Sequence, residues 1–344
     1  RLGAGLPRGR TGRPPALPGL RRRALLVAPA LTPLSPAGAE TSPPRLRTFS
    51  VHCRERYGRP VGKIPLHPGI PCPNRARGGC VFCRPASFTP RSLRSADPLD
   101  EQLRRGRQLL LGDRFRLFFG YFQQETPTAL ATGLLLERCA RILAEPDCVG
   151  LILSTRPDAI AADLPPALAD LCRESGKDCL IELGVQSIHP GSLRLLNRNH
   201  GYGDCVDAVA RLRAAGLEVG AHLILGIPGE SEEDMRASLD AVCALGVQAL
   251  KLHHLQVIRA TPLEQWYHQG RVAVFALDDY LRLLLRLLPR IPTQVTLHRL
   301  CATTHPHLLV APRWGRLAAD LSGQLQALLA AADLRQGQRV GMDG

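Results

Sequence analysis

The stretch from Gly69 to Phe88, GIPCPNRARGGCVFCRPASF, places three cysteines within twelve residues, and the rest of the chain is organised around it. Cys80 and Cys83 form a C-x-x-C pair, and seven residues separate this pair from Cys72. Thiolates are soft ligands that suit iron–sulfur clusters, zinc or copper(I). Three of them can hold three irons of a [4Fe–4S] cube and leave the fourth open, or hold zinc with one outside ligand such as a histidine. A redox dithiol pair with a separate loop cysteine is the remaining interpretation.

The residues around the cysteines favour a metal site over an isolated dithiol. Gly78 and Gly79 accept backbone turns that residues with a Cβ atom resist, so the predicted loop can fold its sulfurs toward one point. The run Pro73-Asn74-Arg75 adds a stiff turn and polar groups beside the first cysteine. The stretch therefore predicts a loop that gathers three thiolates.

The pattern CPNR…RGGCxFCxxASF resembles the cluster loop of radical S-adenosylmethionine (radical SAM) proteins. Within that superfamily it is similar to the YhcC-like family, which is related to the radical SAM domain of the elongator catalytic subunit. The resemblance implies that Cys72, Cys80 and Cys83 bind a [4Fe–4S] cluster, and that S-adenosylmethionine (SAM) chelates the open iron through its amino and carboxylate groups. It also implies that Phe82 packs near the adenine of SAM. The first gap is shorter than is usual in the family, but the loss falls among loop residues and all three sulfurs remain.

The resemblance implies that the chain is a radical SAM enzyme. In such an enzyme the reduced cluster passes one electron to SAM, which splits into methionine and a 5′-deoxyadenosyl radical, and the radical takes a hydrogen atom from a substrate. The sequence does not identify this substrate, and RNA is one candidate because relatives act on RNA. An electron donor such as flavodoxin or ferredoxin would reduce the cluster. The alternative is a three-cysteine zinc-binding structural or nucleic-acid-binding protein without redox chemistry.

Residues 1–48 differ in composition from the rest of the chain. They contain nine arginines and a single acid, Glu40, and carry +8 of the chain's net charge of +14. Since the segment is rich in proline and glycine and has little periodicity, we predict a disordered basic leader, with a targeting peptide or a nucleic-acid-binding arm as alternatives. Its apolar run Ala24–Leu34 holds two prolines and is shorter than the roughly 20 residues that cross a bilayer. We therefore expect no membrane association.

The chain has eleven cysteines, of which eight lie outside the cluster loop. Cys53 precedes the expected domain and is interpreted as a free thiol. The other seven are scattered singly through apolar patterns, as is typical of reduced cysteines that pack as small hydrophobic residues. We therefore expect a reducing, cytoplasmic compartment. The seven are Cys139, Cys148, Cys172, Cys179, Cys205, Cys243 and Cys301.

From residue 61 onward, strand-like and helix-like stretches alternate, which predicts parallel strands joined by right-handed crossovers. Six such units fit a partial (β/α)6 TIM-like barrel of the α/β class better than a closed eightfold barrel. This radical SAM core domain is expected at residues 56–258. The expected strands are 61–67, 116–122, 149–155, 180–186, 218–225 and 249–257. The expected helices are 98–111, 129–144, 164–176, 202–215 and 232–245.

Residues 259–344 form the last predicted domain, a C-terminal extension of α+β type. The apolar patterns predict a helix at 277–288, a strand at 294–299 and a closing helix near 317–332. We expect this extension to pack on the barrel.

In barrels of parallel strands, active sites form where the strands end. The fourth expected strand carries Glu182, Gly184 and Gln186 on one face, because side chains alternate along a strand. Buried carboxylates and amides need polar partners, so this face predicts a bound polar ligand. The run ELGVQS is characteristic of the radical SAM superfamily, which implies that these residues belong to the SAM site and that Gln186 approaches the SAM ribose.

Two further strand ends carry candidates for the SAM site. The resemblance implies that Arg198, in the run NRNH, bonds the SAM carboxylate, and that Ile224 and Gly226 border the adenine. It places the run 121–128 near the SAM amino group, just before a helix for which Thr128 is the expected N-cap.

The remaining strand ends give weaker signals. The run STRPD at 154–158 is expected at the rim of the cofactor or substrate site. Lys251 and His253 share one face of the sixth expected strand, where a substrate contact or acid–base role is one interpretation and a packing role the other. The sequence assigns no catalytic residue.

Overall fold

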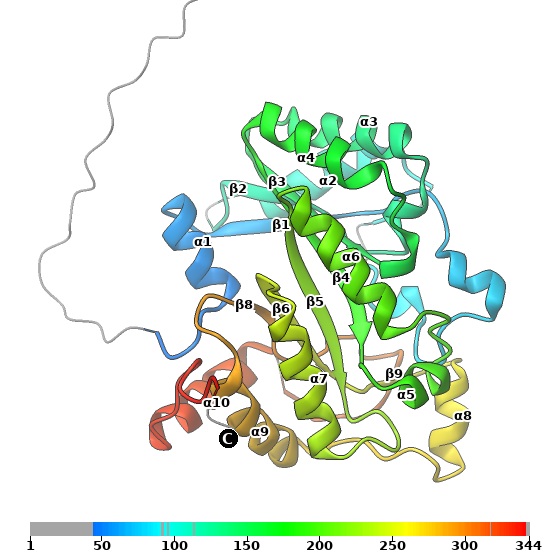
Figure 1. Cartoon of the computed structure of the whole chain (residues 1–344), viewed down its shortest axis with the longest axis vertical. Helices are drawn as coiled ribbons and strands as arrows, with labels where there is room; N and C mark the ends of the chain where they lie inside the picture. Colours follow the sequence, from blue (N-terminus) through cyan, green and yellow to red (C-terminus); the bar gives the residue numbers. More distant parts are fainter. Residues whose placement is uncertain (1–43, 91–92, 95, 113, 317, 342–344) are drawn as a thin grey trace, which may run out of the picture. The chain divides into compact units, whose positions relative to one another are not determined.

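Seven parallel strands form one curled sheet in the order β1-β2-β3-β4-β5-β6-β8 (Figure 1). The structure is a computed structural model that describes residues 44–344 except 91–92, 95, 113, 317 and 342–344. Residues 1–43, most of the predicted leader, lie outside the described residues. The strands are β1 (Val61–Leu66), β2 (Leu117–Phe122), β3 (Cys148–Thr155), β4 (Asp178–Gln186), β5 (Glu218–Leu225), β6 (Ala249–His254) and β8 (Thr296–Arg299).

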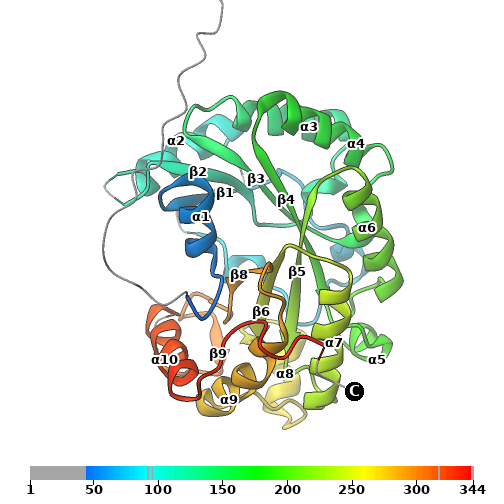
Figure 2. The same ribbon diagram turned by 60° about the vertical axis from the view of Figure 1, so that its left-hand side comes forward.

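Helices that follow the strands cover the outer face of this sheet, so the sheet and helices make a half-barrel (Figure 2). The predicted α/β partial barrel is confirmed. Among the described helices, none has the length and apolar character needed to span a membrane. The helices of the barrel are α2 (Leu99–Leu110), α3 (Thr132–Leu143), α4 (Leu164–Ser175), α5 (Pro190–Leu195), α6 (Tyr202–Ala214) and α7 (Glu232–Ala244). The later helices are α8 (Pro262–His268), α9 (Leu277–Leu287) and α10 (Ala318–Ala331).

Local sequence signals account for where these helices begin and which face they bury. In α3, Leu135, Cys139 and Ile142 recur at helical spacing and are fully buried against the sheet. Helix α7 begins with a capping box, in which the Ser231 hydroxyl accepts from the Asp234 amide at 3.2 Å and the Asp234 carboxylate accepts from the Ser231 amide at 2.8 Å. Such signals are local, and the sequence predicted α2, α3, α4, α6, α7, α9 and α10 to within a few residues but gave no range for α5 or α8.

The C-terminal extension contributes directly to the sheet. Its expected strand is present as β8, which pairs in parallel with β6 and supplies the seventh strand of the half-barrel. The expected sixth strand ends at His254, earlier than predicted, because Val257–Ile258 leaves the sheet as β7 and pairs in antiparallel fashion with β9 (Leu309–Ala311).

The predicted N-cap role of Thr128 is wrong. Helix α3 begins at Thr132, and Pro127–Ala129 forms a separate 3-10 turn. The Thr128 hydroxyl lies 2.5 Å from the Thr155 hydroxyl at the end of β3, so the side chain binds the neighbouring strand and not a helix amide.

A helix that the sequence did not predict, α1 (Phe49–Tyr57), lies between the two edges of the open sheet (Figure 2). The segment just before it is also packed: Leu46 is buried, and Thr48 forms a bridge with Leu297 next to β8. The run FSVHCRERY has no apolar stripe, so helical periodicity gave no signal. Folded structure therefore begins before the boundary at residue 48 expected for the leader.

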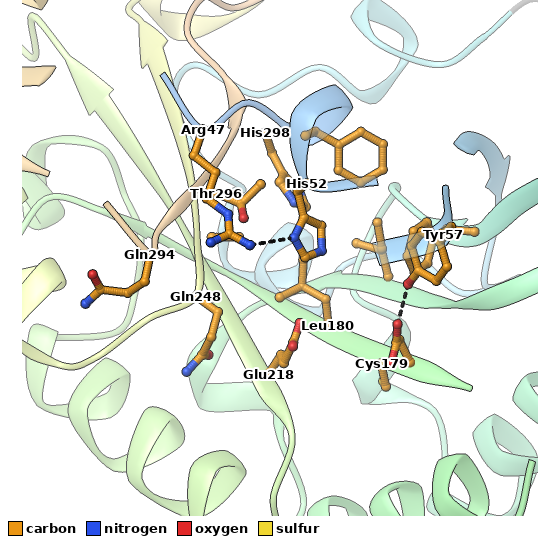
Figure 3. Close-up of a pocket in the computed structure, with 15 residues that line it drawn as sticks. Arg47, His52, Tyr57, Cys179, Leu180, Glu218, Gln248, Gln294, Thr296 and His298 are labelled. Carbon is orange, nitrogen blue, oxygen red and sulfur yellow. Dashed lines mark hydrogen bonds between the residues drawn. The ribbon is translucent and has the colours of Figure 1, made fainter. Parts of the chain in front are cut away.

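Helix α1 closes the end of the barrel where the strands begin. Phe49 packs edge-on against His298 of β8, with ring centroids 4.8 Å apart, and its neighbour Cys53 is fully buried beside Val61 and Phe119. A cavity of about 120 Å³ remains under the helix (Figure 3). The floor of the barrel is thus made jointly by α1 and the first residues of the strands, with an apolar cluster beside a cavity that polar side chains mostly line.

Asp178, at the start of β4, fastens α1 to the sheet by accepting hydrogen bonds from Arg56 and Tyr57. Burial raises the pKa of the Asp178 carboxyl, but these donors outweigh it and hold the pKa below its usual range. A carboxylate with a lowered pKa stabilises the fold above its unfolded-state pKa, and this stabilisation is lost as the pH falls through the folded-state value. Since the Arg56 side chain is 48% exposed, solvent screens part of the interaction.

We predict that Asp178→Asn lowers the free energy of unfolding by about 1–2 kcal/mol at pH 7. The difference from wild type should shrink as the pH falls below about 4, where the unfolded carboxylate also becomes protonated. Urea unfolding followed by circular dichroism measures both effects. Asp170→Asn is the matched control, because Asp170 pairs with Arg173 on an exposed helix face. Equal effects of the two substitutions would show that α1 is not fastened in this way.

Candidate functional site

The cysteine loop folds at its glycines as the sequence predicts. After Cys72 the chain forms a 3-10 turn at Pro73–Arg77, and Gly78 and Gly79 follow with φ of 87° and 70°. These left-handed angles favour glycine because they are strained for residues with a Cβ atom. The turn returns the chain to Cys80. The backbone amide of Cys83 then donates a hydrogen bond to the Cys80 carbonyl at 3.0 Å, which closes a tight turn between the two cysteines.

The segment between α5 and α6 clasps this loop through asparagine side chains. Asn197 donates to the carbonyl of Gly79 at 2.6 Å, and its own carbonyl accepts from the Asn74 amide at 2.8 Å. Asn199 donates to Asn74 Oδ1 at 2.9 Å. Both Asn197 and Asn199 have positive φ, which asparagine tolerates better than most residues. Sequence analysis singled out Arg198 in this run but gave the two asparagines on either side of it no role in holding the loop.

Glu125, at the end of β2, holds the other side of the loop. Its carboxylate accepts from the Cys72 amide at 2.8 Å and forms an ion pair with Arg75. The Glu125 side chain is only 7% exposed, so the ion pair is shielded from water on this side. Sequence analysis placed this run near the mouth of the barrel but gave Glu125 no role, because its partner lies fifty residues earlier in the chain.

The three cysteine sulfurs lie in one electrostatic neighbourhood. Cys83 keeps some exposed surface as a residue. Burial of its thiol is the largest cause that raises its pKa, and the nearby Cys80 and Cys72 add to it, so that the pKa is about 12. The Cys80 sulfur accepts hydrogen bonds from Asn74 Nδ2 and Arg198 Nη1, both at 3.3 Å. Donors directed at sulfur stabilise a thiolate, which is the form that binds iron. The donor set therefore fits an iron–sulfur cluster.

No three His, Cys, Asp or Glu side chains within the described ranges are arranged to hold a single metal ion. In a [4Fe–4S] cube each cysteine binds a different iron, so its ligands need not converge on one point as the ligands of zinc do.

Arg198 connects the cysteine loop to the end of β4. It is 6% exposed, and its Nη2 donates to the Gly184 carbonyl at 2.6 Å while Nη1 reaches the Cys80 sulfur. Arg198 forms no ion pair with any carboxylate that the structure describes. A Cβ atom at Gly184 would lie 3.0 Å from Arg198 Nη2 and 2.8 Å from Gln186 Nε2, so glycine permits the close approach of both side chains.

Gln186 is the strained residue of this site. It lies where the pairing of β4 with β5 shifts register, and its φ of 71° is unfavourable for a residue other than glycine. The side chain is largely buried, and its amide forms no hydrogen bond with any other described residue. Strain together with a side-chain amide that no described residue binds is typical of a ligand-binding position.

Buried polar atoms without partners gather at the same edge of the sheet. Four of the five such atoms found among the described residues lie there: Gln124 Nε2 and Thr126 Oγ1 after β2, Arg156 Nη1 after β3, and Glu230 Oε2 after β5; the fifth, Arg47 Nε, belongs to a residue that lines the cavity under α1. Buried polar groups are normally hydrogen-bonded, so these four call for a polar partner from outside the chain. SAM, with its amino, carboxylate and hydroxyl groups, has the chemistry to supply one. Arg156 belongs to the run STRPD expected at the rim.

The residues expected beside adenine also come together. Phe82 and Ile224 pack in one apolar cluster with Val81. Gly226 follows with φ of 88°, and a Cβ atom there would lie 2.7 Å from the ring of Phe275. The apolar wall and the polar edge thus meet around the cysteine loop.

Glu182 differs from the other residues predicted for the SAM site, because it lies deeper inside the barrel and its carboxylate is already bound. It is 1% exposed and accepts from Ser154 at 2.6 Å, from Tyr121 at 3.1 Å and from Lys251. The rings of His222 and His298 lie 3.2 and 3.1 Å from its oxygens. We call these six residues the Glu182 layer: Tyr121, Ser154, Glu182, His222, Lys251 and His298.

The Glu182 layer shifts the pKa values of its members in opposite directions. Burial raises the pKa of Glu182, but the positive charge of Lys251 and hydrogen bonds from the two histidines outweigh it and hold the pKa well below its usual range. Burial lowers the pKa of Lys251 to about 7 and that of His222 to about 4. The layer therefore contains an ionised carboxylate, a lysine that titrates near neutral pH and neutral histidines.

Family models match most of the chain. The model of the Radical SAM superfamily matches residues 70–242, and that of the Radical SAM C-terminal domain matches residues 247–327. The uncharacterized protein YtqA of Bacillus subtilis is 32% identical over 276 residues, which cover 78% of this chain and 85% of that protein. Protein YhcC of Escherichia coli is 33% identical over 274 residues, which cover 77% of this chain and 86% of that protein.

Two more distant proteins are also similar. The tRNA uridine(34) acetyltransferase of Dehalococcoides mccartyi is 26% identical over 67% of this chain and 56% of that protein. The solved structure of the archaeal Elp3 of Methanocaldococcus infernus superposes with a TM-score of 0.59 at 17% identity, over 80% of this chain and 64% of that chain. This structural likeness shows a shared fold.

We predict that Glu182→Gln lowers the free energy of unfolding by about 3–5 kcal/mol at pH 6, because it leaves the buried Lys251 cation without a carboxylate. The loss should be smaller at pH 8, where Lys251 is mostly neutral. Adding Lys251→Met to Glu182→Gln should restore part of the stability, since it removes the unpaired charge. Urea unfolding of the two single variants and the double variant measures this coupling. Additive losses would mean that the two side chains do not act as a pair.

Proposed function

The chain belongs to the radical SAM superfamily and is a radical SAM enzyme, and we propose that Cys72, Cys80 and Cys83 hold its [4Fe–4S] cluster. Members of this superfamily bind such a cluster together with SAM. The observation that carries the proposal is the Cys80 sulfur, which accepts hydrogen bonds from Asn74 and Arg198 in a loop fixed on both sides. When bound, the cluster and SAM supply the reducing electron and the carbon radical that abstracts hydrogen.

The residues at the mouth of the barrel are proposed to hold SAM. Phe82, Ile224 and Gly226 would border the adenine, since they form the apolar side of the mouth. Gln186 would donate its unused amide to the ribose, and Gly184 leaves room for it. The buried polar atoms nearby would bind the amino and carboxylate groups of SAM.

Arg198 is proposed to have two roles. As a buried cation without a carboxylate partner in the described part of the chain, it suits the SAM carboxylate, as the sequence resemblance implies. Its hydrogen bond to Cys80 also ties the cluster loop to β4. Arg198 would therefore support the cluster as well as SAM.

Glu182 is proposed to act beneath the cofactor and not on it. Its carboxylate is fully engaged by the Glu182 layer, so a direct contact with SAM would have to displace a protein donor. Side chains alternate along β4 at about 3.3 Å per residue, so Glu182 lies about 7 Å below Gly184. The layer thus forms the part of the barrel interior that a substrate would meet.

An RNA substrate is proposed on two observations. The chain carries a net charge of +14, and one relative is named as a tRNA-modifying acetyltransferase. Much of the charge lies in residues 1–48, so it bears mainly on that segment. The proposed function also requires a one-electron donor of the flavodoxin or ferredoxin type.

We predict that the anaerobically reconstituted wild-type chain binds about four irons and four sulfides, as a [4Fe–4S] cluster requires. Cys72→Ala, Cys80→Ala and Cys83→Ala should each lose most of the iron and the associated visible absorption. Cys301→Ala is the control and should retain both, since Cys301 lies outside the loop. Stoichiometric zinc in place of iron would support the zinc-binding alternative. Full iron content in any of the three loop variants would exclude that cysteine as a ligand.

We predict that Gln186→Ala retains the cluster but binds SAM about fivefold more weakly, because it loses one hydrogen bond of about 1 kcal/mol. Arg198→Gln should bind SAM about tenfold to a hundredfold more weakly, as expected for a bond to a charged group. It should also lower the iron content, since it removes the bond to Cys80. Equilibrium dialysis with SAM and iron analysis measure the two effects. Gln108→Ala, on the exposed face of α2, is the control. Unchanged SAM affinity in both site variants would place SAM elsewhere.

A further inference from the structure

The interior of the barrel keeps accessible surface around the Glu182 layer. Lys63 of β1, His253 of β6 and Arg299 of β8 are each half-buried, and the His222 side chain is 16% exposed, although strands surround all four. In closed barrels of parallel strands this region is filled by branched apolar side chains. Polar side chains with accessible surface indicate that the region can admit a polar group.

Lys63 reaches across the open seam of the barrel to the layer. Its Nζ lies 3.2 Å from His298 Nδ1 and 3.9 Å from the centre of the Phe49 ring. Lys63 forms no ion pair with a carboxylate in the described ranges. Burial lowers the pKa of Lys63 to about 8, and the positive charge of Arg299 acts in the same direction.

Arg299 brings a second cation to the same region. A register shift between β6 and β8 pairs it with Lys251, whose side chain lies in the layer. Its guanidinium forms no hydrogen bond or ion pair with any residue that the structure describes. Because it pairs with Lys251, Arg299 shares the interior face of the sheet, and its charge lowers the pKa of His222 and of His253.

The charges of this region do not balance. Among the described residues, Glu182 is the single carboxylate within the layer, and it forms an ion pair with Lys251. Lys63 and Arg299 remain without an acid. Burying a cation costs free energy unless an anion accompanies it. The guanidinium group of an arginine can bind a carboxylate or a phosphate through two parallel hydrogen bonds.

We propose that Arg299 and Lys63, beside the Glu182 layer, bind an oxyanion group of the substrate, a carboxylate or a phosphate. The proposal rests on the function proposed above, because it takes the group at the mouth to be SAM and the interior below it to be the substrate site. Helix α1 covers the opposite end, so the oxyanion would enter from the mouth. The Glu182–Lys251 pair would then orient the bound group without neutralising its charge.

The test is isothermal titration calorimetry of the full chain with inorganic phosphate and, separately, with sodium acetate at constant ionic strength. We expect the wild type to bind at least one of the two probes. Arg299→Gln should weaken that binding about tenfold to a hundredfold, as for loss of a bond to a charged group. Lys63→Met should weaken it less, and Arg299→Lys should restore part of it. Arg282→Gln on the exposed face of α9 is the matched control and should bind like the wild type.

The outcomes separate the two anion sources and the two proposals. Binding of phosphate alone indicates a phosphate-bearing substrate, and binding of acetate alone a carboxylate. Cys80→Ala should bind the probe like the wild type, because the cysteine loop does not form the anion site. Failure of cluster assembly with intact probe binding would overturn the proposed function alone. Absence of binding by a cluster-loaded wild type, or equal binding by the wild type and a folded Arg299→Gln variant, would overturn the anion site.

Discussion

The carboxylate of Glu182 is the interaction on which the barrel interior depends. Burying an ionised carboxylate is costly unless donors surround it, and here the partners come from five other strands, β2, β3, β5, β6 and β8. Each donor must arrive at the right height along its strand, so the layer penalises slips in strand register. An apolar side chain at any of these positions would leave the carboxylate short of a partner. The interior is therefore polar at this level.

This polar level lies between two different environments. Below it, α1 and the first residues of the strands make a floor that combines an apolar cluster with a small cavity lined by polar side chains. Above it, Gln186, Arg198 and the unpartnered atoms of Gln124 and Thr126 surround the mouth. A radical reaction requires a site that is closed to water on one side and open to substrate on the other. The order of the three levels meets that requirement.

The cysteine loop depends on residues that are not cysteines. Asn197 and Asn199 hold it from one side and Glu125 holds it from the other, so hydrogen bonds to two separate segments, the α5–α6 connection and the residues after β2, shape the loop. Preorganisation of this kind lowers the entropy that cluster binding would otherwise cost. It also explains how a loop with a short first gap keeps its cysteines together. Arg198 extends the same clasp to β4 and so couples the loop to the mouth of the barrel.

The sequence by itself determined the features that depend on neighbours along the chain. The alternation of strands and helices, the glycine turn at Gly78 and Gly79, and the polar face of β4 can all be read from spacing and local backbone preference. Only the tertiary structure decided which distant residues meet. Glu125 pairs with Arg75, Lys63 contacts His298 across the seam, and Arg299 pairs with Lys251 through a register shift. Each of these contacts depends on the order of the strands in the sheet. Local periodicity carries no information about such pairings, since a side chain of given spacing can find its partner anywhere in the folded chain.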